Sequence, residues 1–187
     1  MQYTQFWRFI LQAGLLLPVA AFAADVEVTL KDGLDGNLNG YCLDIRGGGR
    51  NIDPAAGLQA HTCYSYRGDL GSDQAFDPEG IARGEFKILA FDVCATMEST
   101  EAGAGVALTA CDESEFQRFD FAANGRISPD SAPGMCLTAG NETTFGMGGT
   151  SPHQIKNLTL ESCADDRAAY QEWTTRTQDE YDSEQGE

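Results

Sequence analysis

Basic residues are scarce in this chain. Its 187 residues include 12 Lys and Arg against 29 Asp and Glu, which gives a formal net charge of −17 at pH 7. Nucleic acids and anionic lipid surfaces bind proteins that bring positive charge to displace counterions. The charge balance therefore argues against both as partners. It is typical of a protein kept soluble in a secreted or salt-exposed setting.

Histidine is also rare, since only His61 and His153 are present. A Ser or Cys nucleophile activated by an imidazole would have to use one of these two, and neither lies in a catalytic motif. A metal site of the usual type needs several His or free Cys residues. Paired carboxylates for glycoside hydrolysis carry no weight, because 29 acids make chance pairs certain. We therefore predict no enzyme, no catalytic residue, no metal and no cofactor.

Long apolar runs are absent except near the N-terminus. There Arg8 precedes the run Phe9–Phe22, and Ala21-Phe22-Ala23 before Ala24 has the small-x-small pattern of a signal cleavage site. The run is shorter than the roughly 20 residues that a membrane span needs. We predict a signal peptide at 1–23, a secreted or periplasmic protein and no membrane insertion. Removing Arg8 with that segment changes the formal charge from −17 to −18.

The six cysteines contain no Cys-x-x-Cys pair. In an exported chain, cysteines at such spacings indicate disulfides rather than a metal site, because export delivers them to an oxidising compartment. Their number alone leaves many connectivities open.

An ordered set of short motifs occurs three times. In each copy a Cys opens a short apolar strand, a second Cys ends an alternating strand, and a Gln-x-aromatic triplet closes the unit. The copies are Cys42–Ile45, Gly57–Cys63 and Asp73–Phe76; Cys94–Met97, Val106–Cys111 and Gln117–Phe119; and Cys136–Ala139, Leu158–Cys163 and Gln171–Trp173. Three copies of one unit predict a pseudo-threefold architecture.

This set, C-L-D, then L-x-x-x-x-C, then Q-x-[WF], resembles the ricin B-type lectin family, whose fold is an all-β trefoil of three such units. The resemblance covers about Val26 to Arg176. It implies a trefoil domain at 24–176 and one disulfide in each unit, namely Cys42–Cys63, Cys94–Cys111 and Cys136–Cys163. It also implies a core that contains Phe76, Phe119 and Trp173. A two-sheet sandwich also uses short alternating strands, but the threefold repeat disfavours it.

Other segments carry weaker signals. Val26, Val28 and Leu30 alternate with polar residues, which predicts a half-buried strand. Asn124-Gly125 predicts a hairpin turn. Outside the signal no convincing amphipathic helix appears, so we expect a nearly all-β protein. The acidic segment 177–187 has no apolar period and is predicted to be disordered.

The loop Asp35–Gly40 matches the first half of a calcium-binding EF-hand loop. The second half does not match, because Arg46 stands where the bidentate Glu belongs. Asx turns account for the composition without any metal.

The resemblance places one sugar pocket in the first unit, formed by Asp44, Gln59, His61, Asp73 and Gln74. Asp44 fills the family's ligand Asp and would accept hydrogen bonds from sugar hydroxyls. The His61 ring stands at the stacking position, where it would cover the C–H face of a pyranose. Asp73 departs from the family's usual Asn and adds a second negative charge near Asp44. On this interpretation, alanine at Asp44 or His61 would abolish binding without changing the melting temperature.

Units two and three lack these groups. Thr96 and Thr138 stand at the ligand-Asp position, and Thr109 and Glu161 at the stacking position. We expect poor or inactive sites there.

The resulting prediction is a module that binds a galactose-type or related sugar, or a polysaccharide, mainly through its first repeat. The alternative is a trefoil that binds no sugar and acts as a protein-interaction or inhibitor module, for which the Gly140–Gln154 insertion is the candidate loop. A structural interpretation of the pocket residues also stays open, in which Asp44 caps a turn and His61 is a half-exposed strand residue.

Overall fold

The structure is a computed structural model that describes residues 24–48, 52–68 and 70–185. The predicted signal peptide at 1–23 lies outside these residues. Within the described ranges, no helix is both long enough and apolar enough to span a membrane.

Short strands make up most of the regular structure. They are β1 (Glu27–Leu30), β2 (Tyr41–Ile45), β3 (Leu58–Thr62), β4 (Lys87–Ile88), β5 (Val93–Met97), β6 (Val106–Ala110), β7 (Phe119–Phe121), β8 (Ile127–Pro129), β9 (Met135–Ala139), β10 (Thr144–Phe145), β11 (Gln154–Lys156), β12 (Leu158–Ser162) and β13 (Trp173–Arg176). The helices are α1 (Pro78–Ala82), α2 (Gly146–Gly149), α3 (Ala168–Gln171) and α4 (Gln178–Gln185). The expectation of a nearly all-β chain therefore missed several short helices.

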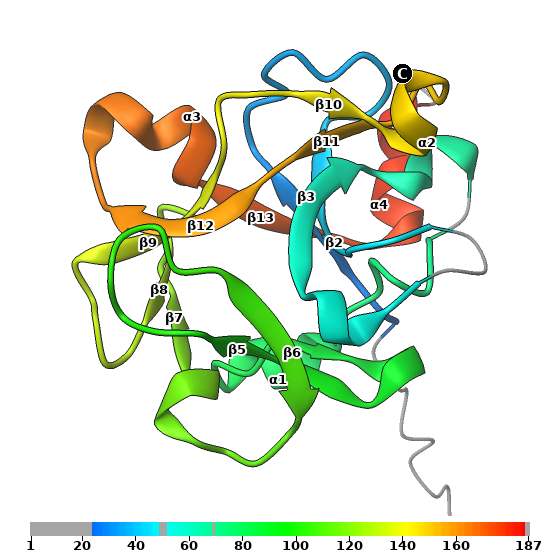
Figure 1. Cartoon of the computed structure of the whole chain (residues 1–187). Coiled ribbons are helices and arrows are strands. Elements are labelled where there is room, and N and C mark those ends of the chain that lie inside the picture. The colour runs from blue at the N-terminus through cyan, green and yellow to red at the C-terminus, as the bar shows by residue number, and fades with distance from the viewer. Residues whose placement is uncertain (1–23, 49–51, 69, 186–187) are drawn as a thin grey trace, which may run out of the picture.

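Each unit contains one antiparallel strand pair between its two cysteines: β2 with β3, β5 with β6, and β9 with β12. Figure 1 shows these pairs in separate lobes around the centre of the molecule. The disulfides are Cys42–Cys63, Cys94–Cys111 and Cys136–Cys163, which confirms the predicted pairing. Their sequence separations are 21, 17 and 27 residues. Loops of this length stabilise the fold by about 3 kcal/mol each by restricting the unfolded chain.

The ends of the domain are closed by a pairing between its first and last strands. β1 runs antiparallel to β13, with Glu27 opposite Arg176 and Leu30 opposite Trp173. The Asn124-Gly125 turn joins β7 to β8, as the sequence predicted. Gly125 has φ +95°, a conformation that glycine adopts without a steric penalty.

Aromatic residues from all three units meet in one core. Phe76, Phe119 and Trp173 are 0%, 3% and 0% exposed, which confirms their predicted burial. The Phe86 ring contacts Phe76 and Phe119 edge-on, at centroid distances of 6.3 and 5.6 Å. Trp173 Nε1 donates to the Leu137 carbonyl at 3.1 Å, so its one polar atom is satisfied inside the core.

The Gln of each Gln-x-aromatic triplet makes equivalent hydrogen bonds in its unit. The side-chain oxygens of Gln74, Gln117 and Gln171 accept from the backbone N–H that follows the late cysteine, on Tyr64, Asp112 and Ala164. Their amide nitrogens donate to the carbonyl that precedes that cysteine, on Thr62, Ala110 and Ser162. The triplet thus fixes the end of each late strand, because buried backbone groups need such partners.

The C-terminal segment corrects the expectation of disorder. Residues 178–185 form α4, and Tyr181 is 7% exposed, with its ring 4.9 Å from the Arg176 guanidinium carbon. Thr177 N donates to Glu180 Oε2 at 2.7 Å, and Glu180 N donates to Thr177 Oγ1 at 3.2 Å. These reciprocal bonds form a capping box, whose Thr-x-x-Glu pattern is visible in the sequence.

The insertion in unit three extends the sheet of unit one. β11 pairs with β3 and places Ile155 opposite His61 and Lys156 opposite Ala60, while β10 pairs with the other edge of β11. The sheet order is β10-β11-β3-β2-β1-β13. In Figure 1, β10 and β11 run beside β3 at the top of the molecule. The insertion therefore lies next to the predicted sugar pocket.

Candidate functional site

A groove of about 920 Å³ lies where β3, the segment after Cys63 and the unit-three insertion meet. Its lining comprises Gly47, Gly48, Gln59, His61, Tyr64, Tyr66, Arg67, Gly146, Met147, Thr150, Ser151, Pro152, His153 and Ile155. A ligand in this groove would contact residues of both unit one and unit three.

The five predicted site residues lie close together and all are buried, with Gln59 and His61 each 4% exposed. Gln59 and His61 line the groove. Asp44, Asp73 and Gln74 do not line it, and they are 1%, 4% and 0% exposed. They form a buried polar layer associated with the two lining residues.

Asp44 is the centre of this buried layer. Its Oδ1 accepts from Gln59 Nε2 and its Oδ2 from Gln74 Nε2, both at 2.8 Å. Desolvation raises the pKa of Asp44 well above its ordinary value, and the charge of Asp73 raises it further. In units two and three the same place is taken by Thr96 and Thr138, whose hydroxyls accept from the triplet Gln at 3.0 Å. Asp44 thus occupies the Gln-binding position that threonine fills elsewhere.

Asp73 also carries a raised pKa, caused by desolvation. Its carboxylate lies under the turn at Gly71, where an added Cβ would stand 2.7 Å from Asp73 Oδ1 and 2.4 Å from Tyr64 Cδ2. A residue with a Cβ at position 71 would therefore force the Tyr64 ring and the Asp73 carboxylate to shift.

His61 is held in one orientation. Its Nδ1 lies 2.9 Å from the Thr62 carbonyl, which fixes Nδ1 as the protonated nitrogen of the neutral ring. Desolvation lowers the pKa of His61 to about 4. The 3.9 Å approach of Nδ1 to Asp44 Oδ2 is therefore no ion pair at neutral pH. The ring is only 4% exposed, so it does not present the open face that a stacking platform needs.

Sequence reasoning missed a cluster of rings that covers His61. The His61 ring lies 5.3 Å from Tyr64 and 5.2 Å from His153, and Tyr66 Oη lies 2.8 Å from His153 Nε2. The Arg67 guanidinium lies 5.3 Å from the ring centres of both tyrosines. A signal for this cluster was available, because Tyr-x-Tyr-Arg follows the late cysteine in unit one only.

The corresponding surface of unit two is a shallower site of about 530 Å³, lined by Thr96, Thr109 and Phe116 among others. Gln117 Nε2 donates to both threonine hydroxyls, which lie 2.7 Å apart. The hydroxyls that face this site are therefore committed to the scaffold. In unit three, Glu161 accepts from Thr159 Oγ1 at 3.1 Å.

In the loop Asp35–Gly40, which resembles half of an EF-hand, the Asp35 carboxylate pairs with a lysine side chain. Lys156, 2% exposed, brings its Nζ to 2.9 Å from Asp35 Oδ1 and 2.6 Å from Thr143 Oγ1. Desolvation raises the pKa of Asp35, but hydrogen bonds from Thr143, Lys156 and Tyr41 outweigh it and lower that pKa well below its ordinary value. The Lys156 ammonium supplies the positive charge that calcium would bring to this loop.

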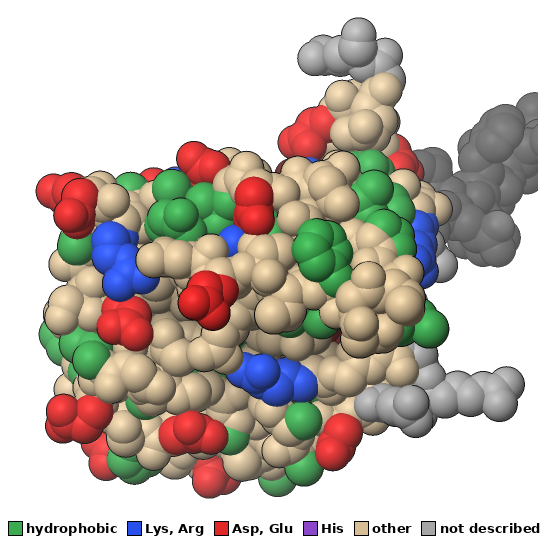
Figure 2. Space-filling view, turned by 45° about the horizontal axis from the view of Figure 1, so that its top comes forward, with side chains coloured by type: hydrophobic (Ala, Val, Ile, Leu, Met, Phe, Trp, Pro, Cys, Tyr) green, Lys and Arg blue, Asp and Glu red, His purple; other side chains and the backbone are tan. Residues whose placement is uncertain are grey.

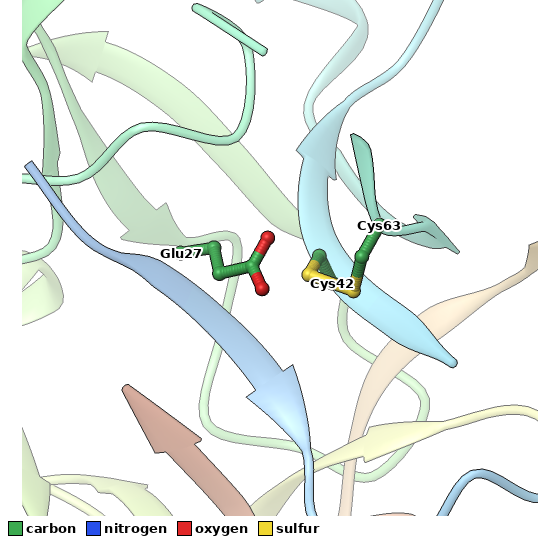
Figure 3. A group of neighbouring side chains, drawn as sticks. All are labelled: Glu27, Cys42 and Cys63. Atoms are coloured by element: carbon green, nitrogen blue, oxygen red, sulfur yellow. A yellow bond between two sulfur atoms is a disulfide. The ribbon is translucent and has the colours of Figure 1, made fainter. Parts of the chain in front are cut away.

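Glu27 lies beside Cys42 and Cys63, and Figure 3 shows the two sulfurs bonded to each other. A disulfide offers no thiolate to a metal ion. The Glu27 carboxylate instead accepts from Arg176 Nε at 2.6 Å and from Ser65 Oγ at 2.9 Å. The alternating pattern of β1 therefore does not describe a half-buried strand, because Glu27 and Thr29 are 0% and 6% exposed.

Acidic side chains are common on the molecular surface. Figure 2 shows Asp and Glu side chains spread over the face that it draws, with few Lys and Arg among them. This agrees with the formal net charge of −17.

The fold and the repeated Gln hydrogen bonds define a β-trefoil of the lectin type. Residues 33–147 match the model of the ricin-type beta-trefoil lectin domain, and the chain belongs to this family. Domains of the family are carbohydrate-binding modules and are generally non-catalytic. A search of curated protein sequences found no match.

Solved structures with low sequence identity share the fold. The solution structure of the mdaA-1 domain is 14% identical, with a TM-score of 0.57, over 82% of this chain and 89% of that one. A non-toxic homologue of type II RIPs from Momordica charantia, in complex with alpha-methyl-D-galactoside, is 21% identical, with a TM-score of 0.52, over 82% of this chain and 48% of that one. The beta-trefoil lectin of the Vibrio vulnificus hemolysin/cytolysin, with N-acetyl-D-lactosamine bound, is 15% identical, with a TM-score of 0.50, over 82% and 94%.

Proposed function

We propose that the protein is a secreted or periplasmic lectin that binds a galactose-type sugar, or a polysaccharide containing one, through the groove of its first unit. The observation that carries this proposal is the meeting of Gln59, His61 and the unit-three insertion in one groove. The bound alpha-methyl-D-galactoside of the Momordica homologue supports the sugar class. The three disulfides are compatible with export.

In this proposal the five predicted residues have two roles. Gln59 contacts the sugar, and its amide offers both a donor and an acceptor. His61, whose ring is 4% exposed and lies against Tyr64 and His153, supports the wall of the groove. Asp44 and Gln74 support Gln59 from below, through the Asp44 hydrogen bonds to both glutamines, and Asp73 lies in the same buried layer. The half-buried rings of Tyr64 and Tyr66 supply the apolar surface that a pyranose C–H face needs.

The test is a glycan array probed with the oxidised protein, followed by titration of the best ligand against variants. Gln59→Ala is expected to weaken binding about tenfold, because one or two direct hydrogen bonds are lost. Thr109→Ala, in unit two, is the matched control and is expected to leave affinity unchanged. An array without any saturable signal would refute the proposal.

One observation favours a second function, binding to another protein: the tip of the unit-three insertion is apolar and exposed. Met147 is 85% exposed and Phe145 46% exposed. Such residues favour a contact with another protein, which is the inhibitor or interaction alternative. Met147→Ser would then abolish binding to that protein and leave sugar affinity intact, whereas a loss of sugar affinity would assign Met147 to the lectin groove.

A further inference from the structure

Arg67 is a cation in the groove that no described acid neutralises. Most other described cations lie within 4.0 Å of a carboxylate, namely Lys31, Arg83, Lys87, Arg118, Arg126, Lys156 and Arg176. Arg46 and Arg167 also form no such pair with a described acid, but they do not line the groove. Among the described acids none lies within 4.0 Å of Arg67, so the groove presents this exposed guanidinium to an anionic group of a ligand.

The groove holds the Arg67 guanidinium in a fixed position. Its Nε donates to Tyr66 Oη at 2.9 Å, and one terminal nitrogen, Nη2, donates to His153 Nε2 at 2.6 Å. The rings of Tyr64 and Tyr66 lie against the guanidinium. This arrangement is typical of arginines that are preorganised for recognition.

Two of the five guanidinium N–H groups are committed in this way. The other terminal nitrogen, Nη1, has no hydrogen-bond partner among the described residues. The remaining donors form the fork that matches a carboxylate or a sulfate.

The cation lies one ring away from the proposed sugar contacts. His153 accepts from Arg67 and also lies 5.2 Å from the His61 ring. A sugar bound along the groove, over the rings that cover His61, therefore meets Arg67. The groups on the sugar side, Gln59 and His61, are neutral at pH 7. They suit hydroxyls, whereas Arg67 suits an anionic substituent.

We propose that the ligand of this groove is an acidic sugar, whose carboxylate or sulfate pairs with Arg67. This inference rests on the proposed lectin function and narrows its ligand. The acids of the buried layer, Asp44 and Asp73, do not line the groove and are 1% and 4% exposed, so neither of them meets a ligand beside Arg67.

The experiment compares an oligogalacturonide with its fully methyl-esterified form by titration calorimetry. The two ligands have the same sugar rings and differ in charge at each carboxyl. The assay is run at about 0.15 M salt, where charges beyond about 8 Å are largely screened. The protein is expected to bind the acid about tenfold more tightly than the ester, as one charge-assisted hydrogen-bonded pair would give.

Arg67→Gln is expected to bring the two affinities together by weakening the acid alone, and Arg67→Lys to retain part of the preference. Arg83→Gln removes the same charge from a side chain that does not line the groove, and is expected to keep the full preference. A parallel comparison of galactose 6-sulfate with galactose separates the two anions. An Arg67-dependent preference in that pair alone would support the proposal and assign the anion as a sulfate.

Equal affinity for the charged and neutral forms of both pairs would overturn the acidic-sugar proposal and leave the lectin function standing. A preference that survives Arg67→Gln would overturn it as well. If no sugar of either kind binds, the lectin function and this inference both fall.

Discussion

Asp44→Asn tests whether the buried carboxyl contacts the ligand or supports the site from below. Asp44 is 1% exposed, and each of its oxygens accepts one glutamine amide. Asparagine keeps the shape and one acceptor. Its amide nitrogen needs a new acceptor, which Gln59 supplies by turning its side-chain amide over. Gln74 must stay, because its oxygen holds the Tyr64 N–H.

The sign of the stability change follows from the raised pKa of Asp44, which desolvation and then the charge of Asp73 cause. The folded protein holds a proton on Asp44 at pH values where the unfolded chain has lost it. Stability therefore falls as pH rises from the unfolded pKa, near 4, through the folded pKa. Each pKa unit corresponds to about 1.4 kcal/mol. Asparagine does not titrate, so Asp44→Asn removes this pH-dependent contribution. The stability of the variant relative to the wild-type protein therefore increases with pH.

Asp44→Ala behaves differently, because it leaves two glutamine amides without their acceptor. Gln74 Nε2 keeps the Thr62 carbonyl, but the Gln59 amide loses its only described acceptor. The expected cost is about 1–3 kcal/mol. The expectation that alanine at Asp44 leaves the melting temperature unchanged therefore does not follow once the burial of this residue is known.

The assay is urea unfolding at several pH values between 5 and 8, with the disulfides intact. Trp173 is 0% exposed, so its fluorescence reports the loss of the core. We expect Asp44→Asn to keep sugar affinity within about threefold and to flatten the decline of stability with pH. A variant that folds with wild-type stability but binds no sugar would refute the supporting role and restore Asp44 as a ligand contact.

Two further predictions concern buried charges. Arg176→Met leaves the Glu27 carboxylate, 0% exposed, without its cation and is expected to lower the free energy of unfolding in urea by about 3–5 kcal/mol. The double variant with Glu27→Gln is expected to recover part of that loss. Losses of stability that simply add in the double variant would contradict the pairing of the two residues. Lys156→Met removes the ammonium that lies 2.9 Å from Asp35, and is expected to raise the pKa of Asp35 in a carboxyl NMR titration. An unchanged pKa would show that the hydrogen bonds from Thr143 and Tyr41 are enough to keep the Asp35 pKa low.

The fold was predictable because its determinants are local and repeated. The cysteine order and the Gln-x-aromatic triplets are spaced along each unit, and the structure uses them for bonds within that unit, such as Gln171 to Ser162. Helix α4 was also within reach of the sequence, since Thr177 and Glu180 spell its capping box. The composition argument for disorder took no account of that local signal.

The depth of the site was not predictable from strand alternation. In Cys42–Ile45, alternation places Asp44 on the face opposite Leu43, which suggested an accessible carboxylate. In the structure both faces of β2 are buried. Gln59 and Gln74 cover Asp44, and β11 pairs with the free edge of β3. The pairing of Ile155 with His61 joins two units, and no periodicity within either segment encodes it.

The differences between units carry more functional information than the repeat. The three triplet glutamines make the same backbone bonds, so the repeat accounts for the scaffold. The segment after the late cysteine begins Tyr64-Ser65-Tyr66-Arg67 in unit one, but Asp112-Glu113 in unit two and Ala164-Asp165 in unit three. Unit three has Arg167 at the position equivalent to Arg67, but only the first segment places two tyrosine rings beside its arginine. Because the unit-three insertion adds His153 beside them, the groove is a property of two units together and has no equivalent that symmetry would generate elsewhere in the described chain.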